Sequence, residues 1–212
     1  MKLVLQGFTG KMGNVVYEYL KEKGYTFVGL FDEKHKIQEK KITKCDAIID
    51  FSTVESAKNM FDLAIKYHKP IIIGVTGFTS EDLEMFDTKS LEAKIATYII
   101  YNFLISIQRL KGFVDELSDN YDKIYIEDIH NVTKKDAPSG TTKFLIDKVE
   151  KNKLEVSSIR TNYFTYEHKI RLFNEFESLE ITHKCYNKLG YAKGVEIALT
   201  HLNTFVGLKR SI

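Results

Sequence analysis

The first hundred residues alternate short apolar runs with amphipathic stretches, and this alternation limits the possible folds more than any other feature of the sequence. The apolar runs are predicted strands: Lys2–Gln6, Tyr25–Phe31, Ala47–Phe51, Pro70–Gly74 and Ala96–Ile100. The stretches between them are predicted helices: Lys11–Lys23, Ser52–His68 and Ser80–Ser90. Strands and helices in strict alternation predict an α/β fold, with a parallel sheet covered by helices on both faces.

After about residue 105 the pattern changes. A helix is predicted over Ile105–Leu117, then a strand over Lys123–Asp128, then a helix over Ser139–Lys151 that Ser139 and Thr141 would cap. Three β-rich runs follow in succession: Ser157–Phe164, His168–Phe176 and Glu177–Tyr186. They predict a mostly antiparallel sheet. Because a last helix is predicted over Gly190–Phe205, we expect two subdomains.

Composition excludes several classes of protein. The 212 residues are 43% hydrophobic, and 31 Lys and Arg nearly balance 29 Asp and Glu, so a packed core is expected and a large nucleic-acid face is not. Cys45 and Cys185 are too few for a disulfide framework, and no cluster of ligand-type residues has metal-binding spacing. No apolar run suits a signal peptide or a membrane span, so we expect a cytoplasmic protein.

A glycine run follows the first predicted strand. In Gly7-Phe-Thr-Gly10-Lys-Met-Gly13, backbone N–H groups at the start of a helix can face a pyrophosphate, and glycines allow its close approach. Asp32 ends the second strand, where a carboxylate can accept hydrogen bonds from an adenosine ribose. Asp32 favours NADH over NADPH, although Lys34 and Lys36 could pair with a 2′-phosphate. The glycine run and Asp32 therefore predict a nucleotide site; of NADH and NADPH, the cofactors implied by the resemblance described below, NADH is expected to be slightly preferred.

A second candidate site runs from His130 to Thr141. His130 could shuttle a proton near neutral pH, and Lys134 could donate a proton or hold an anion. Ser139-Gly140-Thr141 could present N–H groups to a carboxylate. From spacing alone, the alternative is a surface loop with an exposed histidine, a solvated lysine and a helix cap.

The segment His-x-x-x-Lys-x-Asp-Ala-Pro-Ser-Gly-Thr, with Gly-x-x-Gly-x-Met-Gly near the N-terminus, resembles the dihydrodipicolinate reductase (4-hydroxy-tetrahydrodipicolinate reductase) family. Other matching segments fall in the family's order: Asp50-Phe-Ser, Gly74-Val-Thr-Gly77, Asn102-Phe103, Arg160 with His168, and Leu179–Lys184. The resemblance implies a Rossmann domain of residues 1–105 plus 188–212. It also implies an inserted α+β domain, 106–187, that binds substrate and forms a homotetramer.

The implied reaction is NAD(P)H-dependent reduction of a small dicarboxylate ring in the diaminopimelate route to lysine. By position, the resemblance assigns the cofactor site to Gly7, Phe8, Thr9, Gly10, Lys11, Met12, Asp32, Gly74, Val75, Thr76, Ile100, Tyr101, Asn102 and Phe103. It assigns catalysis to His130 and Lys134, and substrate binding to Asn131, Gly140 and Thr141. Asn131 stands where the family usually has a second histidine, so we expect a lower affinity for substrate.

Two alternative functions remain open at the level of the sequence. Asn131, Tyr101 and Asn162 depart from the family's pattern, which would suit a protein that binds NAD(P)H without turning over the ring substrate. The fold would also suit another Rossmann oxidoreductase, acting on an amino or imino acid.

Overall fold

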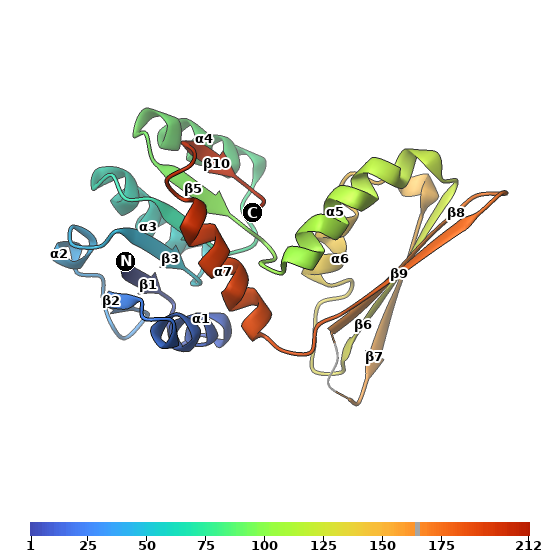
Figure 1. The fold of residues 1–212 in the computed structure, drawn as a ribbon, viewed down its shortest axis with the longest axis horizontal. Coiled ribbons are helices and arrows are strands. Elements are labelled where there is room, and N and C mark those ends of the chain that lie inside the picture. Colours follow the sequence, from blue (N-terminus) through green and yellow to red (C-terminus); the bar gives the residue numbers. More distant parts are fainter. Residues whose placement is uncertain (164–165) are drawn as a thin grey trace. The chain divides into compact units, whose positions relative to one another are not determined.

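The computed structural model describes residues 1–163 and 166–212. They form two compact units, which are taken in turn (Figure 1). The first consists of residues 1–103 and 189–212, and the second of residues 104–188. In the described part of the chain, no helix is both long and apolar enough to cross a membrane.

The first unit contains a six-stranded sheet in the order β10-β5-β4-β3-β1-β2, and each strand pairs with its neighbours in parallel. The strands are β1 Lys2–Gln6, β2 Thr26–Phe31, β3 Ala47–Asp50, β4 Ile71–Ile73, β5 Ala96–Ile99 and β10 Gly207–Lys209. The helices are α1 Lys11–Glu22, α2 Glu39–Ile42, α3 Val54–Lys66, α4 Ser80–Glu92 and α7 Leu189–His201. The predicted parallel sheet is confirmed.

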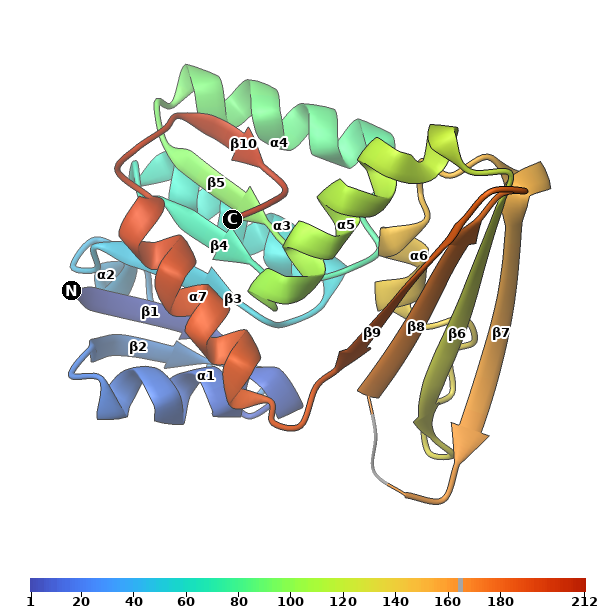
Figure 2. The same cartoon turned by 45° about the vertical axis from the view of Figure 1, so that its right-hand side comes forward.

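Both faces of this sheet are covered, because successive strand residues point to opposite sides. Leu3 and Leu5 of β1 join the cluster that includes Val195 of α7, whereas Val4 joins the cluster that includes Phe61 of α3. Figure 2 shows α1 and α7 on one face of the sheet, with α3 behind it. All three residues of β4 are fully buried, as the isoleucine run predicts.

The second unit contains a four-stranded sheet in the order β7-β6-β8-β9. The strands are β6 Lys123–Asn131, β7 Leu154–Thr161, β8 Tyr166–Phe173 and β9 Ser178–Lys184. The helices are α5 Ile105–Leu117 and α6 Gly140–Leu145, with short 3-10 turns at Ser118–Asn120 and Lys151–Lys153. β6 pairs with β7 in parallel and with β8 antiparallel, and β8 pairs with β9 antiparallel. The predicted mostly antiparallel sheet is confirmed.

Two short elements were not predicted. α2 has four residues and β10 has three, so neither is long enough to show a helical or an alternating period. β10 nevertheless completes the sheet, since it pairs with β5 from Gly207↔Ala96 to Lys209↔Tyr98.

Several predicted boundaries are wrong. The helix predicted to reach Lys151 ends at Leu145, because Ile146 leaves the helical conformation and Val149 turns inward to a buried position. The helix predicted to reach Phe205 ends at His201, whose carbonyl oxygen accepts hydrogen bonds from the N–H and Oγ1 of Thr204.

The β-rich segments also have different bounds. β6 continues past Asp128 to Asn131, because its pairing with both neighbours reaches His130. β7 begins at Leu154 rather than Ser157 and ends at Thr161. Phe164, the predicted end of that run, lies outside the described residues. Since β6 extends this far, His130 belongs to a strand and not to a loop.

One close contact in the first unit gives a test of the fold. A Cβ atom on Gly194 of α7 would lie 1.8 Å from the carbonyl oxygen of Phe103, so backbone must move to accept it. We expect Gly194→Ala to lower the free energy of unfolding by about 1–3 kcal/mol, measured by urea denaturation. Gly112→Ala in α5 is the matched control. Its Cβ meets nothing within 4 Å, so we expect a gain of up to about 1 kcal/mol. A Gly194→Ala protein as stable as the wild type would contradict this packing.

Candidate functional site

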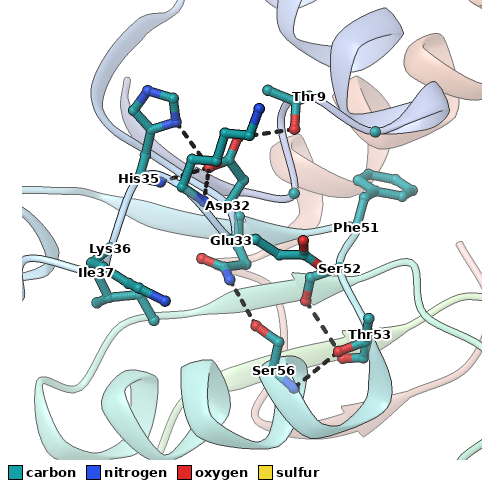
Figure 3. A pocket seen from close by; sticks show the side chains of 14 residues that line it. Thr9, Asp32, Glu33, His35, Lys36, Ile37, Phe51, Ser52, Thr53 and Ser56 are labelled. Carbon is teal, nitrogen blue, oxygen red and sulfur yellow. Dashed lines mark hydrogen bonds and ion pairs between the residues drawn. The ribbon is translucent and has the colours of Figure 1, made fainter.

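A cavity of about 920 Å³ lies at the carboxyl ends of β1, β2 and β3 (Figure 3). It is lined by Gln6, Gly7, Thr9, Gly10, Asp32, Glu33, Lys34, His35, Lys36, Ile37, Phe51, Ser52, Thr53 and Ser56. Ligands of open parallel sheets bind outside this edge. Of the predicted cofactor residues, Gly7, Thr9, Gly10 and Asp32 therefore share one cavity.

The turn between β1 and α1 requires its glycines. Gly7 has φ +78°, and a Cβ there would lie 2.6 Å from the carbonyl oxygen of Phe51. A Cβ on Gly13 would lie 2.0 Å from the carbonyl oxygen of Gly7. Gly10 is the N-cap residue of the 12-residue helix α1 and has no side chain to cap it. The turn, which also contains Phe8 and leads into Lys11 and Met12 of α1, fits a pyrophosphate at the helix N-terminus.

Asp32 is held in one position by four hydrogen bonds. Its Oδ1 accepts from the backbone N–H groups of Lys34 (2.8 Å) and His35 (2.7 Å) and faces the ring Nδ1 of His35 at 2.8 Å. Its Oδ2 accepts from the Thr9 hydroxyl at 2.9 Å. Burial alone would raise the pKa of Asp32, but these hydrogen bonds outweigh it and hold the pKa well below its usual range. The cavity therefore carries a fixed negative charge.

Asp50 lies under the same edge and is fully buried. Its Oδ1 accepts hydrogen bonds from the N–H and hydroxyl of Ser52, whereas its Oδ2 has no hydrogen-bond partner among the described residues. Burial raises the pKa of Asp50 to about 6, although the hydrogen bonds from Ser52 act in the opposite direction. Gln6, its neighbour across β1 and β3, donates to Ser56 Oγ at 2.7 Å.

Phe8, Lys11 and Met12 do not line the cavity, and neither do the predicted cofactor residues that follow β4 and β5. Phe51 connects the two regions. A Cβ on Gly74 would lie 2.2 Å from the Phe51 ring, and the rings of Phe51 and Phe103 are 5.5 Å apart between centroids. The Phe51 ring therefore lies between the cavity and the ends of β4 and β5.

Among these residues the side chains differ in exposure. Val75, Ile100, Asn102 and Phe103 are buried, so Val75, Ile100 and Phe103 contribute mainly to the core. Thr76 is exposed. The half-buried ring of Tyr101 lies 5.4 Å from the guanidinium of Arg210. In this region, the groups that can make polar contacts with a ligand are backbone groups and the side chains of Thr76, Tyr101 and Asn102.

His130 of β6 is 2% exposed, so the alternative of an exposed loop histidine is wrong. Its Nδ1 lies 3.0 Å from Oδ1 of Asp128 on the same face of the strand. The His168 ring of β8 lies beside it, with 5.3 Å between ring centroids. Burial lowers the pKa of His168 to about 4, and the neighbouring His130 adds to this effect. His168 is therefore neutral near pH 7.

Lys134 and Gly140 contact the same carboxylate, that of Asp136. Lys134 Nζ lies 2.8 Å from Asp136 Oδ1, and the Gly140 N–H donates to Asp136 Oδ2 at 3.3 Å. Burial would raise the pKa of Asp136, but the Lys134 ammonium outweighs it and lowers that pKa. Ser139 caps α6 by accepting a hydrogen bond from the Thr142 N–H, as predicted. Thr141, the other predicted cap, lies inside the first turn of the helix.

Asn131, the third predicted substrate residue, is engaged in the turn after β6. Its Oδ1 accepts from the N–H and hydroxyl of Thr133, and its Nδ2 donates to the carbonyl oxygen of Tyr163 at 3.2 Å. These contacts shape the turn that leads to Lys134.

Sequence reasoning missed Asp128. Asp128, His130 and His168 each bring a ligand-type atom within 4.8 Å of the others. A search for metal-binding spacing along the sequence does not bring these three residues together, because His168 lies on the neighbouring strand. The Asp-x-His spacing on a strand was the available signal, since residues two apart share a face. Arg160 Nη2 lies 3.5 Å from Asp128 Oδ2. Its permanent positive charge disfavours a second cation, so we interpret the cluster as a hydrogen-bonding network.

The parallel sheet, the glycine turn, the fixed acid and the second α+β unit define a Rossmann-type dinucleotide-binding oxidoreductase. Comparison with family models then identifies the family. The model of the dihydrodipicolinate reductase N-terminus matches residues 1–103, and that of the C-terminus matches residues 104–211. The chain belongs to the dihydrodipicolinate reductase family.

Comparisons with individual proteins lead to the same family. A 4-hydroxy-tetrahydrodipicolinate reductase from Rickettsia bellii is 31% identical over an alignment of length 215, which covers 90% of this chain and 84% of that protein. The same enzyme from Thermosipho africanus is 29% identical over 197 residues, covering 92% and 88%. The dipicolinate-bound dihydrodipicolinate reductase from Paenisporosarcina sp. TG-14 has a similar fold, with a TM-score of 0.82 at 18% identity over 100% of this chain and 97% of its own.

The raised pKa of Asp50 has a consequence for stability. Between the pKa of an unfolded aspartate, about 4, and the folded value, about 6, the folded state binds more protons than the unfolded state. Stability from this carboxyl group is therefore greatest below pH 4 and is lost as the pH rises through 6.

The test compares the free energy of unfolding of Asp50→Asn with that of the wild type, measured by urea denaturation. We expect the value for Asp50→Asn minus the value for the wild type to increase by up to about 3 kcal/mol between pH 4 and pH 7.5. Asp62→Asn, on an exposed side chain, is the control. An equal difference at both pH values would contradict the expectation.

Proposed function

We propose that this chain reduces 4-hydroxy-tetrahydrodipicolinate with NAD(P)H in the diaminopimelate route of lysine biosynthesis. The proposal rests on one observation above all. In this member of the family, a buried histidine, His130, precedes a segment in which Lys134 and Gly140 together hold a carboxylate. The dipicolinate of the Paenisporosarcina relative supports a small dicarboxylate as substrate.

The residues of the first unit fit the cofactor. The turn from Gly7 to Met12 would hold the pyrophosphate, and Asp32 would meet the adenosine ribose. The residues after β4 and β5, Gly74–Thr76 and Ile100–Phe103, would border the nicotinamide. NAD(P)H supplies a hydride when it is bound.

The second unit would bind the substrate and transfer a proton to it. Lys134, Gly140 and Thr141 would bind a substrate carboxylate in the way that Lys134 and Gly140 hold Asp136, and Asn131 would border it. The 4-hydroxyl group must leave as water to give the unsaturated dihydrodipicolinate ring. Hydride addition to that ring then leaves electron density that must be protonated. Lys134 would donate this proton and His130 would act as acid and base. As a further part of the proposal, the chain works in the cytoplasm as a homotetramer assembled through the second unit.

The roles of His130 and Lys134 can be tested in an assay coupled to the synthase that supplies the substrate. We expect the wild type to oxidise NAD(P)H, and His130→Ala and Lys134→Ala each to lower kcat by roughly 10²–10⁴-fold because a positioned proton donor or acceptor is lost. NADH binding, followed by fluorescence, should be unchanged.

His201→Ala and Lys148→Ala are matched controls on exposed side chains. Near-normal rates in the first pair would refute the assigned roles. Tight NADH binding without wild-type turnover would favour the non-catalytic alternative.

The choice between the two cofactors follows from the charges around the ribose position. The fixed charge of Asp32 opposes a 2′-phosphate, whereas Lys34 and Lys36 lie on the same loop. We expect kcat/KM to be modestly higher for NADH than for NADPH. Asp32→Asn should shift that ratio toward NADPH by about 5- to 10-fold, which corresponds to about 1 kcal/mol of charge repulsion in a water-like dielectric. A strong wild-type preference for NADPH would contradict the argument from Asp32.

A further inference from the structure

Asp128 lies at the centre of the second candidate site without belonging to its predicted residues. It is fully buried on β6, and its side chain points to the same face as Ile126 and His130, since residues two apart on a strand share a face. Burial alone would raise its pKa, but hydrogen bonds from His130 and Ser139 outweigh burial and leave the pKa below its usual range. Asp128 is therefore a buried carboxylate that stays charged.

One oxygen of this carboxylate faces the two histidines. Asp128 Oδ1 lies 3.0 Å from His130 Nδ1 and 3.7 Å from His168 Nε2. Neither Asp128 Oδ1 nor His130 Nδ1 makes a hydrogen bond of regular geometry in the described part of the chain, so their 3.0 Å approach is a charge contact between a buried carboxylate and a buried ring nitrogen. Because a carboxylate only accepts hydrogen bonds, it favours the form of His130 in which Nδ1 carries the proton. The other ring nitrogen, Nε2, is then left to exchange a proton with a substrate.

The other oxygen holds the segment that follows β6. Asp128 Oδ2 accepts the Ser139 N–H at 2.8 Å, directly before Gly140, and lies 3.5 Å from Arg160 Nη2. Arg160 in turn donates to the carbonyl oxygens of Lys134 (3.3 Å) and Asp136 (2.6 Å). Asp128 thus contacts the segment from Lys134 to Ser139 directly at Ser139, and through Arg160 at Lys134 and Asp136.

We propose that Asp128 is a positioning residue, which fixes the tautomer and orientation of His130 through Oδ1 and, through Oδ2, the backbone of the segment that carries Lys134 and Gly140. This role rests on the proposed function of that site. One buried charge then sets the relative positions of the proton-transfer group and the carboxylate-binding group.

The test compares Asp128→Asn with the wild type. Asparagine has nearly the same shape and can still accept the Ser139 N–H, but its amide would donate to His130 Nδ1 and move the ring proton to Nε2. We expect kcat to fall on the order of 100-fold, with a much smaller change in KM and unchanged NADH affinity. Ser158→Ala, which removes a 3.4 Å contact to the same oxygen and leaves the charge, should keep kcat within about 2-fold. Asp147→Asn controls for loss of a carboxylate at the surface of the same unit.

A second readout does not depend on turnover. Two-bond ¹⁵N–¹H spectra report which nitrogen of each of the six histidines carries the proton, and His130→Gln identifies the signal of His130. We expect the proton on Nδ1 in the wild type at pH 8 and on Nε2 in Asp128→Asn. A wild-type His130 protonated on Nε2 would overturn the proposal even if Asp128→Asn does not fold. A folded Asp128→Asn with wild-type kcat would also overturn it. An inactive wild type with the expected tautomer would instead refute the proposed function and leave this role of Asp128 standing.

Discussion

The close approach of β1 to β3 is the constraint on which the first unit depends. The two strands pair in parallel from Leu3↔Ala47 to Gln6↔Asp50, so both end at the same level. The turn after β1 then meets the backbone after β3, where Gly7 has no room for a side chain beside Phe51. This contact leaves the start of α1 open to the cavity. A larger residue at Gly7 would affect the sheet and the proposed pyrophosphate position together.

The second unit uses strand register to assemble its site. In β6, Asp128 lies opposite His168 of β8 and beside Ser158 of β7. Arg160 of β7 lies beside His130. A shift of one residue in either pairing would send these side chains to the other face of the sheet. The register is held by the apolar residues further along the same strands, since Ile124, Ile126, Ile170 and Leu172 are buried. Packing at one end of the sheet therefore aligns the polar groups at the other end.

Much of this organisation was predictable because it repeats along the chain. The strands of the first sheet follow from apolar runs, and the cavity residues Gly7, Gly10 and Asp32 follow from their positions at strand ends. The parts that were missed depend on contacts between distant segments. β10 has three residues and is a strand only because β5 offers an edge. Likewise, Asp128 is an ordinary strand aspartate until Ser139 and Arg160 are brought to it by the fold. The length of α6 was missed because helical propensity does not reveal the turn that buries Val149.

The first unit takes its last strand and one of its helices from the end of the chain. During synthesis, residues 1–103 leave the ribosome long before α7 and β10 exist. Until then, Ala96 and Tyr98 of β5 lack the partners Ala192, Val195 and Leu199 of the same apolar cluster, and β5 is an open edge. Such an edge can pair with another chain. The nascent protein thus passes through a stage in which its first unit is exposed on one side, and the 24 residues 189–212 close it.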